Sequence, residues 1–402
     1  MRSHRSYAAT IAVVMVVMVV MAVLVAGPTS VAAQIAPPPG PELARVAAAL
    51  EPEIRRAMLD GSIPSLTVAL TDRNGELWSA AYGESNLWAR TPASTNTVYL
   101  IGSTFKAQST IALMQVREKS GFALDDPVNE YLAGMRIRGE DASNPVTFRQ
   151  MLTHTSGMPG DFGPHLVWGE TVPLALADYL GDSLRVVTPP LQAVVYSNMA
   201  YSLVAHLVER LSGVPYKQYI REHVWGAIDM NDTAFDLTPE MEERLAIPYV
   251  IDPGSGRPVA TDRLKANVWP AGIVYGTIRD QASWVRFNLG DGTSGGRRVL
   301  PATMLDEMHT LQYEQFVGQG LGGGWGYEKP GYGLTWWTSE NAGEAFFAHS
   351  GSLPGYTAFV SGNRTRGFGI ALLTNGNRAH PHLVRITKLA LELMAEHLGE
   401  SR

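Results

Sequence analysis

Segments with the pattern of β-strands occur at both ends of this chain, whereas helix and loop patterns dominate its middle. Apolar and β-branched residues indicate two strands over residues 65–71 and 76–82, joined by a hairpin turn at 72–75. Near the other end, four more strands with short turns between them are indicated over residues 331–338, 345–349, 356–362 and 368–374. Their close spacing predicts an antiparallel meander.

Helical spacing of apolar residues predicts one helix over residues 41–60 and another over residues 381–398. From residue 125 to about residue 249, short helices and loops are expected. The simplest arrangement is an α+β fold in which one antiparallel sheet, built from both chain ends, is flanked by the terminal helices and carries an inserted, mainly helical domain. We therefore predict a sheet domain formed by residues 41–124 and 265–402, and a helical domain formed by residues 125–264.

Composition limits the classes of partner and chemistry. With 402 residues, 45% hydrophobic and 17% charged, the chain can bury a sizeable core. A net charge of −6 without a long basic run argues against nucleic acid as a partner. The absence of cysteine excludes disulfides, thiolate metal sites and a thiol nucleophile.

The N-terminal segment has the layout of an export signal. Arg2, His4 and Arg5 precede an apolar run over residues 8–26, and small residues suitable for cleavage follow, up to Ala33. We predict cleavage after Ala33, so that residues 1–33 are a signal peptide and residues 34–40, rich in proline, are a linker. A helix over residues 8–26 would be about 28 Å long, so an uncleaved membrane anchor is the alternative. Either way the folded part is expected outside the cytoplasm, periplasmic or extracellular.

A Ser-x-x-Lys pattern, Ser103 to Lys106, lies where an extended segment changes into a helix. Residues i and i+3 share one face of a helix, so the two side chains can touch. A serine hydroxyl becomes a good nucleophile when a neighbouring base removes its proton, and a desolvated lysine can be that base. The same pattern is also typical of an ordinary helix start with a solvated lysine, so it needs support from elsewhere in the chain.

Two further motifs place polar groups at the ends of predicted elements. Tyr196-Ser197-Asn198 precedes a helix and is either a helix N-cap or a loop that presents a phenol beside an amide. His349-Ser350-Gly351-Ser352 ends a strand. It is either a polar strand end with a turn, or a backbone that a substrate approaches at Gly351, with an N–H at Ser352 as half of an oxyanion hole.

In this order the three motifs resemble those of class C β-lactamases and of the D-alanyl-D-alanine peptidases and esterases that share their fold. Connecting segments at residues 124–128, 152–157 and 270–272 are also similar to that group. The resemblance extends from about residue 43 to about residue 398. The class A pattern, with Ser-Asp-Asn and Lys-Thr-Gly, fits less well.

The resemblance implies an exported serine hydrolase of β-lactamase/transpeptidase-like fold that works through an acyl-enzyme. It implies that Ser103 is the nucleophile, that Lys106 is its base, and that Tyr196 carries the proton to the leaving group and helps to activate the deacylating water. The backbone N–H groups of Ser103 and Ser352 would form the oxyanion hole. No metal and no organic cofactor are implied.

The resemblance also implies substrate-binding roles for the remaining motif residues. Asn198 would hold Lys106 or the substrate, while His349, Ser350 and Gly351 would line the strand along which the substrate lies. His154, in one of the connecting segments, is read as a structural residue hydrogen-bonded near the cleft.

One position departs from the class C pattern. Those β-lactamases carry lysine where this chain has His349, and a neutral imidazole cannot hold a substrate carboxylate as a permanent ammonium does. We therefore predict that esters or D-amino-acid peptides are better substrates than β-lactams. The alternatives are a class C-type β-lactamase and a non-hydrolytic, penicillin-binding-like protein. The expected partner is a small ester, peptide or lactam, and membrane attachment would require the N-terminal run to stay uncleaved.

Overall fold

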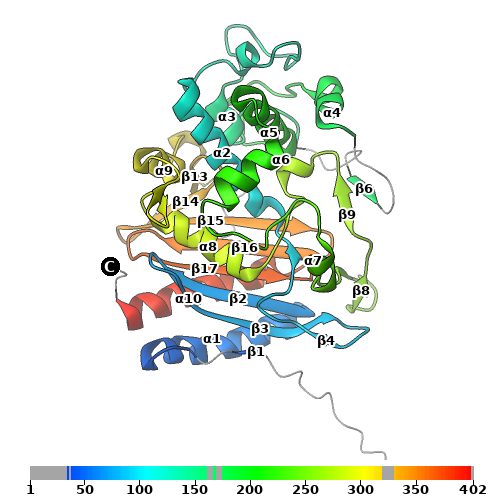
Figure 1. Cartoon of the computed structure of the whole chain (residues 1–402), viewed down its shortest axis with the longest axis vertical. Coiled ribbons are helices and arrows are strands. Elements are labelled where there is room, and N and C mark those ends of the chain that lie inside the picture. Colours follow the sequence, from blue (N-terminus) through cyan, green and yellow to red (C-terminus); the bar gives the residue numbers. More distant parts are fainter. Residues whose placement is uncertain (1–33, 36–37, 161–165, 169–173, 319–329, 400–402) are drawn as a thin grey trace, which may run out of the picture. The chain divides into compact units, whose positions relative to one another are not determined.

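The computed structural model describes residues 34–35, 38–160, 166–168, 174–318 and 330–399, all within the compact unit Val31–Arg402. Its centre is an antiparallel sheet whose strands come from both ends of the chain, as the sequence predicts (Figure 1). In spatial order the strands are β1 (Gln34–Ile35), β3 (Glu76–Asn86), β2 (Ser65–Asp72), β17 (Phe368–Thr374), β16 (Tyr356–Asn363), β15 (Glu344–Leu353), β14 (Trp337–Asn341) and β13 (Gly331–Tyr332), and β4 (Thr91–Pro92) pairs with β3.

The two ends of the chain meet in the middle of this sheet, where β2 pairs with β17 and Val68 lies opposite Leu372. Both faces of the sheet are covered, because successive strand residues point to opposite sides. Along β17, Ile370 and Leu372 belong to one buried cluster, whereas Ala371 and Leu373 belong to the other. The sheet therefore separates two hydrophobic cores.

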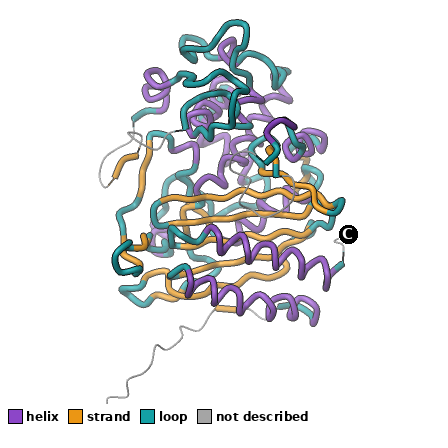
Figure 2. The backbone as a smooth tube through the Cα atoms, turned by 180° about the vertical axis from the view of Figure 1, so that it is seen from behind, coloured by secondary structure: helices purple, strands orange, loops and turns teal. Residues whose placement is uncertain are grey.

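Two terminal helices cover one face of the sheet, as Figure 2 shows. They are α1 (Pro41–Asp60) and α10 (His380–Leu398), and their bounds confirm the predicted helices to within a residue. The buried residues of α1 are spaced three or four apart, which gives the helix one apolar stripe. They are Leu43, Val46, Ala47, Leu50, Ile54 and Ala57.

The second core lies between the opposite face and the remaining helices (Figure 1). This core includes buried residues of both predicted domains, the sheet domain and the helical domain. These helices are α2 (Phe105–Ser120), α3 (Phe148–Leu152), α4 (Leu176–Ser183), α5 (Asn198–Ser212), α6 (Tyr216–Tyr219), α7 (Pro239–Glu243), α8 (Ile278–Leu289) and α9 (Ala302–His309). Shorter helical turns are η1 (Gly102–Thr104), η2 (Val128–Tyr131), η3 (Ile220–Trp225), η4 (Trp269–Ala271) and η5 (Glu314–Phe316).

Short two-stranded ribbons lie outside the main sheet. They pair β5 (Tyr99–Leu100) with β10 (Tyr275–Gly276), β6 (Leu166–Trp168) with β9 (Leu264–Ala266), β7 (Tyr249–Ile251) with β8 (Pro258–Ala260), and β11 (Thr293–Ser294) with β12 (Arg297–Arg298). The β5–β10 and β6–β9 ribbons matter most for function, because they border the residues singled out by the sequence motifs.

Some elements differ from the expectation. Residues 331–338 form no single strand: β13 and β14 are two strands of a tight hairpin, closed by a hydrogen bond from the N–H of Gly333 to the carbonyl of Trp336. Strand β15 continues through Leu353, so His349 to Ser352 lie within the strand and do not end it. In the predicted linker, Gln34–Ile35 pair with β3 as an edge strand.

Residues 1–33, where the signal peptide or anchor is predicted, lie outside the described residues. Among the helices of the described part, none is both long enough and apolar enough to cross a membrane.

Candidate active site

Ser103 lies in the tight turn η1, between the two-residue strand β5 and helix α2. The turn is stabilised by a 2.8 Å hydrogen bond from the hydroxyl of Thr104 to the carbonyl of Ile101. The side chain of Ser103 is half-buried, whereas its neighbours on both sides are buried. The motif therefore occupies the junction between extended chain and helix that the sequence predicts.

Lys106 is buried one turn further on and reaches back to this serine. Its Nζ lies 2.9 Å from the Oγ of Ser103 and donates a 2.6 Å hydrogen bond to the carbonyl of Ala271. Burial lowers the pKa of Lys106 well below its usual value, because a charged amine is poorly solvated there. Burial therefore favours the neutral amine, which is the form that can accept a proton from Ser103.

Two tyrosine rings flank the amine of Lys106. Its Nζ lies 4.8 Å from the ring centroid of Tyr196 and 5.6 Å from that of Tyr201. Tyr201 is fixed from behind, since its hydroxyl bonds the carbonyl of Leu152 at 3.1 Å and the hydroxyl of Thr335 at 2.6 Å. The rings favour the ammonium form by about 0.5–2 kcal/mol, but desolvation opposes them and lowers the pKa.

Tyr196 stands directly before helix α5. A side-chain hydrogen bond with Ser103 lowers its pKa, but burial raises that pKa more, so the phenol keeps its proton at neutral pH. Ser197 is the N-cap of α5, and its Oγ accepts a 3.1 Å hydrogen bond from the N–H of Ala200. The N-cap interpretation of this motif is confirmed for Ser197, while its neighbour Tyr196 faces the nucleophile.

His154 contacts the segment that carries Tyr196 at three points. Its carbonyl accepts a 2.7 Å hydrogen bond from the N–H of Val195, and its Nδ1 accepts a 3.0 Å hydrogen bond from the N–H of Ser197. Between these two points its ring lies 4.1 Å from the Tyr196 ring, at an angle of 32°. Burial, and then the proximity of Lys106, lower the pKa of His154 well below its usual value. His154 is therefore a neutral, structural residue that positions Tyr196.

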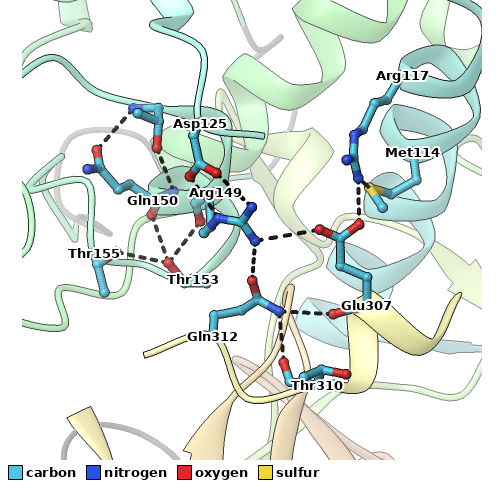
Figure 3. Close-up of polar contacts among 11 residues, drawn as sticks. Met114, Arg117, Asp125, Arg149, Gln150, Thr153, Thr155, Glu307, Thr310 and Gln312 are labelled. Atoms are coloured by element: carbon cyan, nitrogen blue, oxygen red, sulfur yellow. Dashed lines mark hydrogen bonds and ion pairs between the residues drawn. The ribbon is translucent and has the colours of Figure 1, made fainter. Parts of the chain in front are cut away.

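Polar contacts behind the site fix helix α3, and His154 lies just after the end of this helix. Arg149 of α3 binds both carboxylate oxygens of Asp125 at 2.8 Å, bonds the side-chain oxygen of Gln312, and lies 3.6 Å from Glu307 (Figure 3). Glu307 in turn accepts a 2.6 Å bond from Arg117 at the end of α2. The helix that carries Lys106 and the loop that carries His154 are thus joined by one network.

Strand β15 approaches the turn at Ser103 so closely that Gly351 has no room for a side chain. A Cβ atom at Gly351 would lie 2.1 Å from the carbonyl oxygen of Ile101. This position was expected to be glycine so that a substrate could approach the backbone. The structure adds a second reason, because Gly351 packs directly against the turn that carries the serine.

The same close packing brings two backbone amides near the serine. Gly102, with φ +58°, would place a Cβ 3.2 Å from the nitrogen of Ser352. Gly272 would place a Cβ 3.0 Å from the nitrogen of Ser103. The amides of Ser103 and Ser352 thus both lie at closely packed backbone, next to Gly272 and Gly102 respectively.

His349 is buried in β15, with 1% of its surface exposed, and its ring stacks on Trp337 with centroids 5.4 Å apart. Its Nδ1 lies 2.7 Å from the carbonyl oxygen of Ser350, so Nδ1 carries the proton and Nε2 offers a lone pair. Burial and the proximity of Lys106 lower the pKa of His349 to about 3, although the bond to Ser350 raises it. The ring is therefore neutral at physiological pH.

The remaining motif residues lie around the nucleophile with different exposure. Ser350 is half-buried and Ser352 is exposed, whereas Asn198 is 2% exposed. Asn198 and Ser103 share a small cavity with apolar neighbours. The other residues that line this cavity are Leu264, Ala266, Val268, Ala271, Gly272, Ile273 and Leu353.

The structure also shows contacts that the sequence analysis missed. Tyr201 and Thr335 support the Lys106 amine from behind, and a backbone carbonyl, that of Ala271, binds it directly. Tyr201 lies five residues after Tyr196 in a predicted helix, which is the only signal that could have found it. A carbonyl has no side-chain signature, and the hydroxyl of Thr335 reaches Tyr201 from a distant turn with φ +75°.

Comparisons with known proteins identify the family of this chain. The family model described as Beta-lactamase matches residues 47–394. This chain belongs to the beta-lactamase family. Its members are serine hydrolases of one fold, as the sequence motifs predicted. Among curated relatives, Protein flp of Staphylococcus aureus (strain MW2) is 24% identical over 341 residues, which cover 82% of this chain. The chain spans 64% of the length of that relative.

Solved structures share the fold. A class C beta-lactamase from Rhodobacter sphaeroides superposes with a TM-score of 0.69 at 19% identity, covering 87% of this chain and 99% of that one. A D-amino acid amidase from Ochrobactrum anthropi SV3 superposes with a TM-score of 0.69 at 20% identity, covering 88% and 99%. At these identities the likeness shows the fold alone.

Proposed function

We propose that this beta-lactamase family member is an exported serine hydrolase that cleaves ester or amide bonds through an acyl-enzyme on Ser103. We further propose that esters, or peptides and amides of D-amino acids, are better substrates than β-lactams. The observation that carries the proposal is the 2.9 Å separation between the Nζ of buried Lys106 and the Oγ of Ser103. A solvated lysine at a helix start would be neither buried nor directed at the serine.

The first half of the reaction acylates the serine. Neutral Lys106 takes the proton of Ser103, and Oγ forms a bond to the substrate carbonyl carbon. The oxyanion then accepts hydrogen bonds from the N–H groups of Ser103 and Ser352. The phenol of Tyr196 gives its proton to the leaving group as the scissile bond breaks, and the proton on Lys106 restores the phenol.

The second half of the reaction releases the acyl group. Tyr196 and Lys106 together remove a proton from a water molecule, whose oxygen attacks the ester carbonyl of the acyl-enzyme. The bond to Oγ breaks and the proton returns to Ser103. No step uses a metal or an organic cofactor, and the neutral state of His349 leaves the site without the fixed positive charge that a substrate carboxylate would bind.

A short-chain ester assay tests the proposal. The wild type should hydrolyse p-nitrophenyl acetate with repeated turnover, and Ser103→Ala should lose about 10³-fold or more of kcat/KM. Ser120→Ala, at the exposed C-terminal end of the same helix, is the matched control and should keep full activity. A stoichiometric burst without turnover would indicate the non-hydrolytic binding protein instead. Equal activity in Ser103→Ala and wild type would exclude Ser103 as the nucleophile.

Export is the second part of the proposal and has its own test. We infer from the apolar run over residues 8–26 that the chain is secreted and cleaved after Ala33. The mature protein should begin at Gln34 and appear in the periplasmic or extracellular fraction. Retention in membranes with residues 1–33 intact would support the anchored form.

A further inference from the structure

A second, larger cavity lies beyond the wall of the small cavity at Ser103. Ala266 and Ile273 line both cavities, so the two spaces are adjacent across these side chains. The larger one has a volume of about 650 Å³, within the range of small-molecule sites. The small one alone has little room for more than the reacting carbonyl.

We propose that this second cavity receives the acyl group of the substrate, and that it suits an apolar acyl chain that ends in a carboxylate. The inference rests on the proposed function, since an acyl subsite exists only if Ser103 is acylated.

The residues that line the two cavities indicate which part of the substrate the larger cavity would hold, the acyl group or the leaving group. Neither Tyr196, the proposed proton donor to the leaving group, nor His349 lines either cavity. One short turn, η4, serves both the catalytic lysine and the larger cavity: its Ala271 carbonyl binds Lys106, and its Trp269 lines the cavity. We therefore assign the cavity to the acyl part of the substrate, which stays on the enzyme after the leaving group departs.

The floor of the larger cavity is aromatic. Phe235 and Trp269 meet edge to face, with centroids 5.5 Å apart. The side chain of Lys217 lies over both rings, with its Nζ 5.0 Å from the Trp269 centroid and 5.6 Å from that of Phe235. Leu237 and Ile273 extend the apolar lining. Such a surface favours an alkyl or aryl group over a polar one.

Charged side chains around the cavity are paired in two cases, and a third, Lys265, has no acidic partner among the described residues. Lys217 pairs with Asp236 at 2.7 Å, and Arg263 pairs with Glu242. Lys265, half-buried on β9 and also in the lining, makes no ion pair with any part of the chain that the structure describes. A carboxylate at the end of an apolar chain would complement this ammonium.

A matched series of p-nitrophenyl esters tests the proposal, because the leaving group stays constant while the acyl group changes. The probes are the acetate, the octanoate and the mono-ester of suberate, which has the octanoate chain length with a terminal carboxylate. The wild type should favour octanoate over acetate and suberate over octanoate, and added salt should weaken only the second preference.

Two variants assign these preferences to residues. Trp269→Ala should lower the octanoate-to-acetate ratio of kcat/KM by about tenfold, through lost apolar contact. Lys265→Met should lower the suberate-to-octanoate ratio by about three- to fivefold and leave the octanoate-to-acetate ratio near wild type. Lys119→Met, which removes an exposed lysine at the end of α2, is the control and should change neither ratio.

Each outcome decides the inference. Unchanged ratios in both variants, or equal losses for octanoate and suberate in Lys265→Met, would overturn it. Should Trp269→Ala fail to fold, the half-buried position of Lys265 keeps the charge test available. Persistent acetate hydrolysis in Ser103→Ala would instead contradict the proposed nucleophile, so the two failures are distinguishable.

Discussion

Burial disfavours the charged form of three basic side chains near Ser103. Burial lowers the pKa values of Lys106, His154 and His349, and for the two histidines the proximity of the lysine lowers them further. The two histidines are therefore neutral at neutral pH, and the lone pair of His154 accepts a hydrogen bond from the amide of Ser197 next to Tyr196. The Nζ of Lys106 lies 2.9 Å from the serine hydroxyl.

Replacement of His154 should reduce turnover, because Tyr196 would lose a residue that positions it. His154→Phe keeps a ring but removes the acceptor for the N–H of Ser197, and we expect kcat to fall about 10- to 100-fold with KM changed much less. His154→Asn offers an acceptor again and tolerates the φ of +59° at this position, so it should recover part of kcat. Steady-state kinetics on p-nitrophenyl acetate measure both. Equal losses in the two variants would contradict a positioning role.

The neutral state of His349 predicts poor use of β-lactams. These substrates carry a carboxylate that a fixed ammonium would bind, and a neutral ring with a pKa of about 3 supplies no such charge. We expect kcat/KM for cephalosporins to stay at least about 10²-fold below that for short-chain esters. Measured cephalosporin turnover close to ester turnover would contradict the assigned role of this residue.

At the scale of elements, the site depends on how closely strand β15 approaches the turn η1. The glycine in β15 and the two glycines near Ser103 let backbone meet backbone without side chains between them. This approach brings the amide of Ser352 into the region of the nucleophile. Arg149 of α3 pairs with Asp125 and with Glu307 of α9 (Figure 3). These ion pairs fix α3 and the loop after it, which positions Tyr196.

Gly351→Ala should therefore damage both stability and activity. The added methyl would lie 2.1 Å from a carbonyl oxygen, so either the strand or the turn has to move. We expect a destabilisation of about 1–3 kcal/mol and a loss of ester hydrolysis of at least about 10²-fold. Gly75→Ala, in the β2–β3 turn where a Cβ meets nothing within 4 Å, is the control. Activity and thermal unfolding of the two variants should differ, and matching behaviour would contradict this account.

The sheet and terminal helices could be predicted because their apolar periodicity is strong. Pro41–Asp60 and Phe368–Thr374 carry long, uninterrupted patterns, and the structure reproduces their bounds. Residues 331–338 carry a continuous apolar and aromatic pattern too, but a positive φ at Thr335 folds them into a hairpin. A local sequence pattern cannot predict this turn, because Thr335 contacts Tyr201 and Thr110, which are distant in the chain.

The parts of the candidate site that consist of side chains could be predicted from the sequence. Ser103, Lys106 and Tyr196 could be named because the resemblance supplied motifs in a fixed order. The Ala271 carbonyl and the close approach at Gly351 could not, because both depend on how distant segments pack.

At the scale of the whole molecule, both chain ends build one sheet, and the site lies where its strand β15 meets the helices (Figure 1). His154 and His349 are both buried there, and the ring of His349 stacks on Trp337 of the sheet. Their low pKa values therefore link the stability of the entire fold to pH.

Stability should fall in mild acid. His154 and His349 have folded pKa values below the usual 6.5, so below about pH 6.5 the unfolded chain binds protons that the folded chain does not. Each of these two buried rings should cost about 1.4 kcal/mol per pH unit below that point, until its folded pKa is reached. Denaturant unfolding at pH 7.5 and pH 5.5 measures the difference. Equal midpoints, or a higher midpoint at pH 5.5, would contradict the buried neutral histidines.

Intact-mass analysis of the protein during reaction with p-nitrophenyl esters tests the central claim most directly. We predict a transient mass increase of one acyl group, located on Ser103 by peptide mapping, absent in Ser103→Ala and present in Ser120→Ala. An acyl group mapped to another residue, or full turnover with no adduct in rapidly quenched samples, would contradict an acyl-enzyme on Ser103.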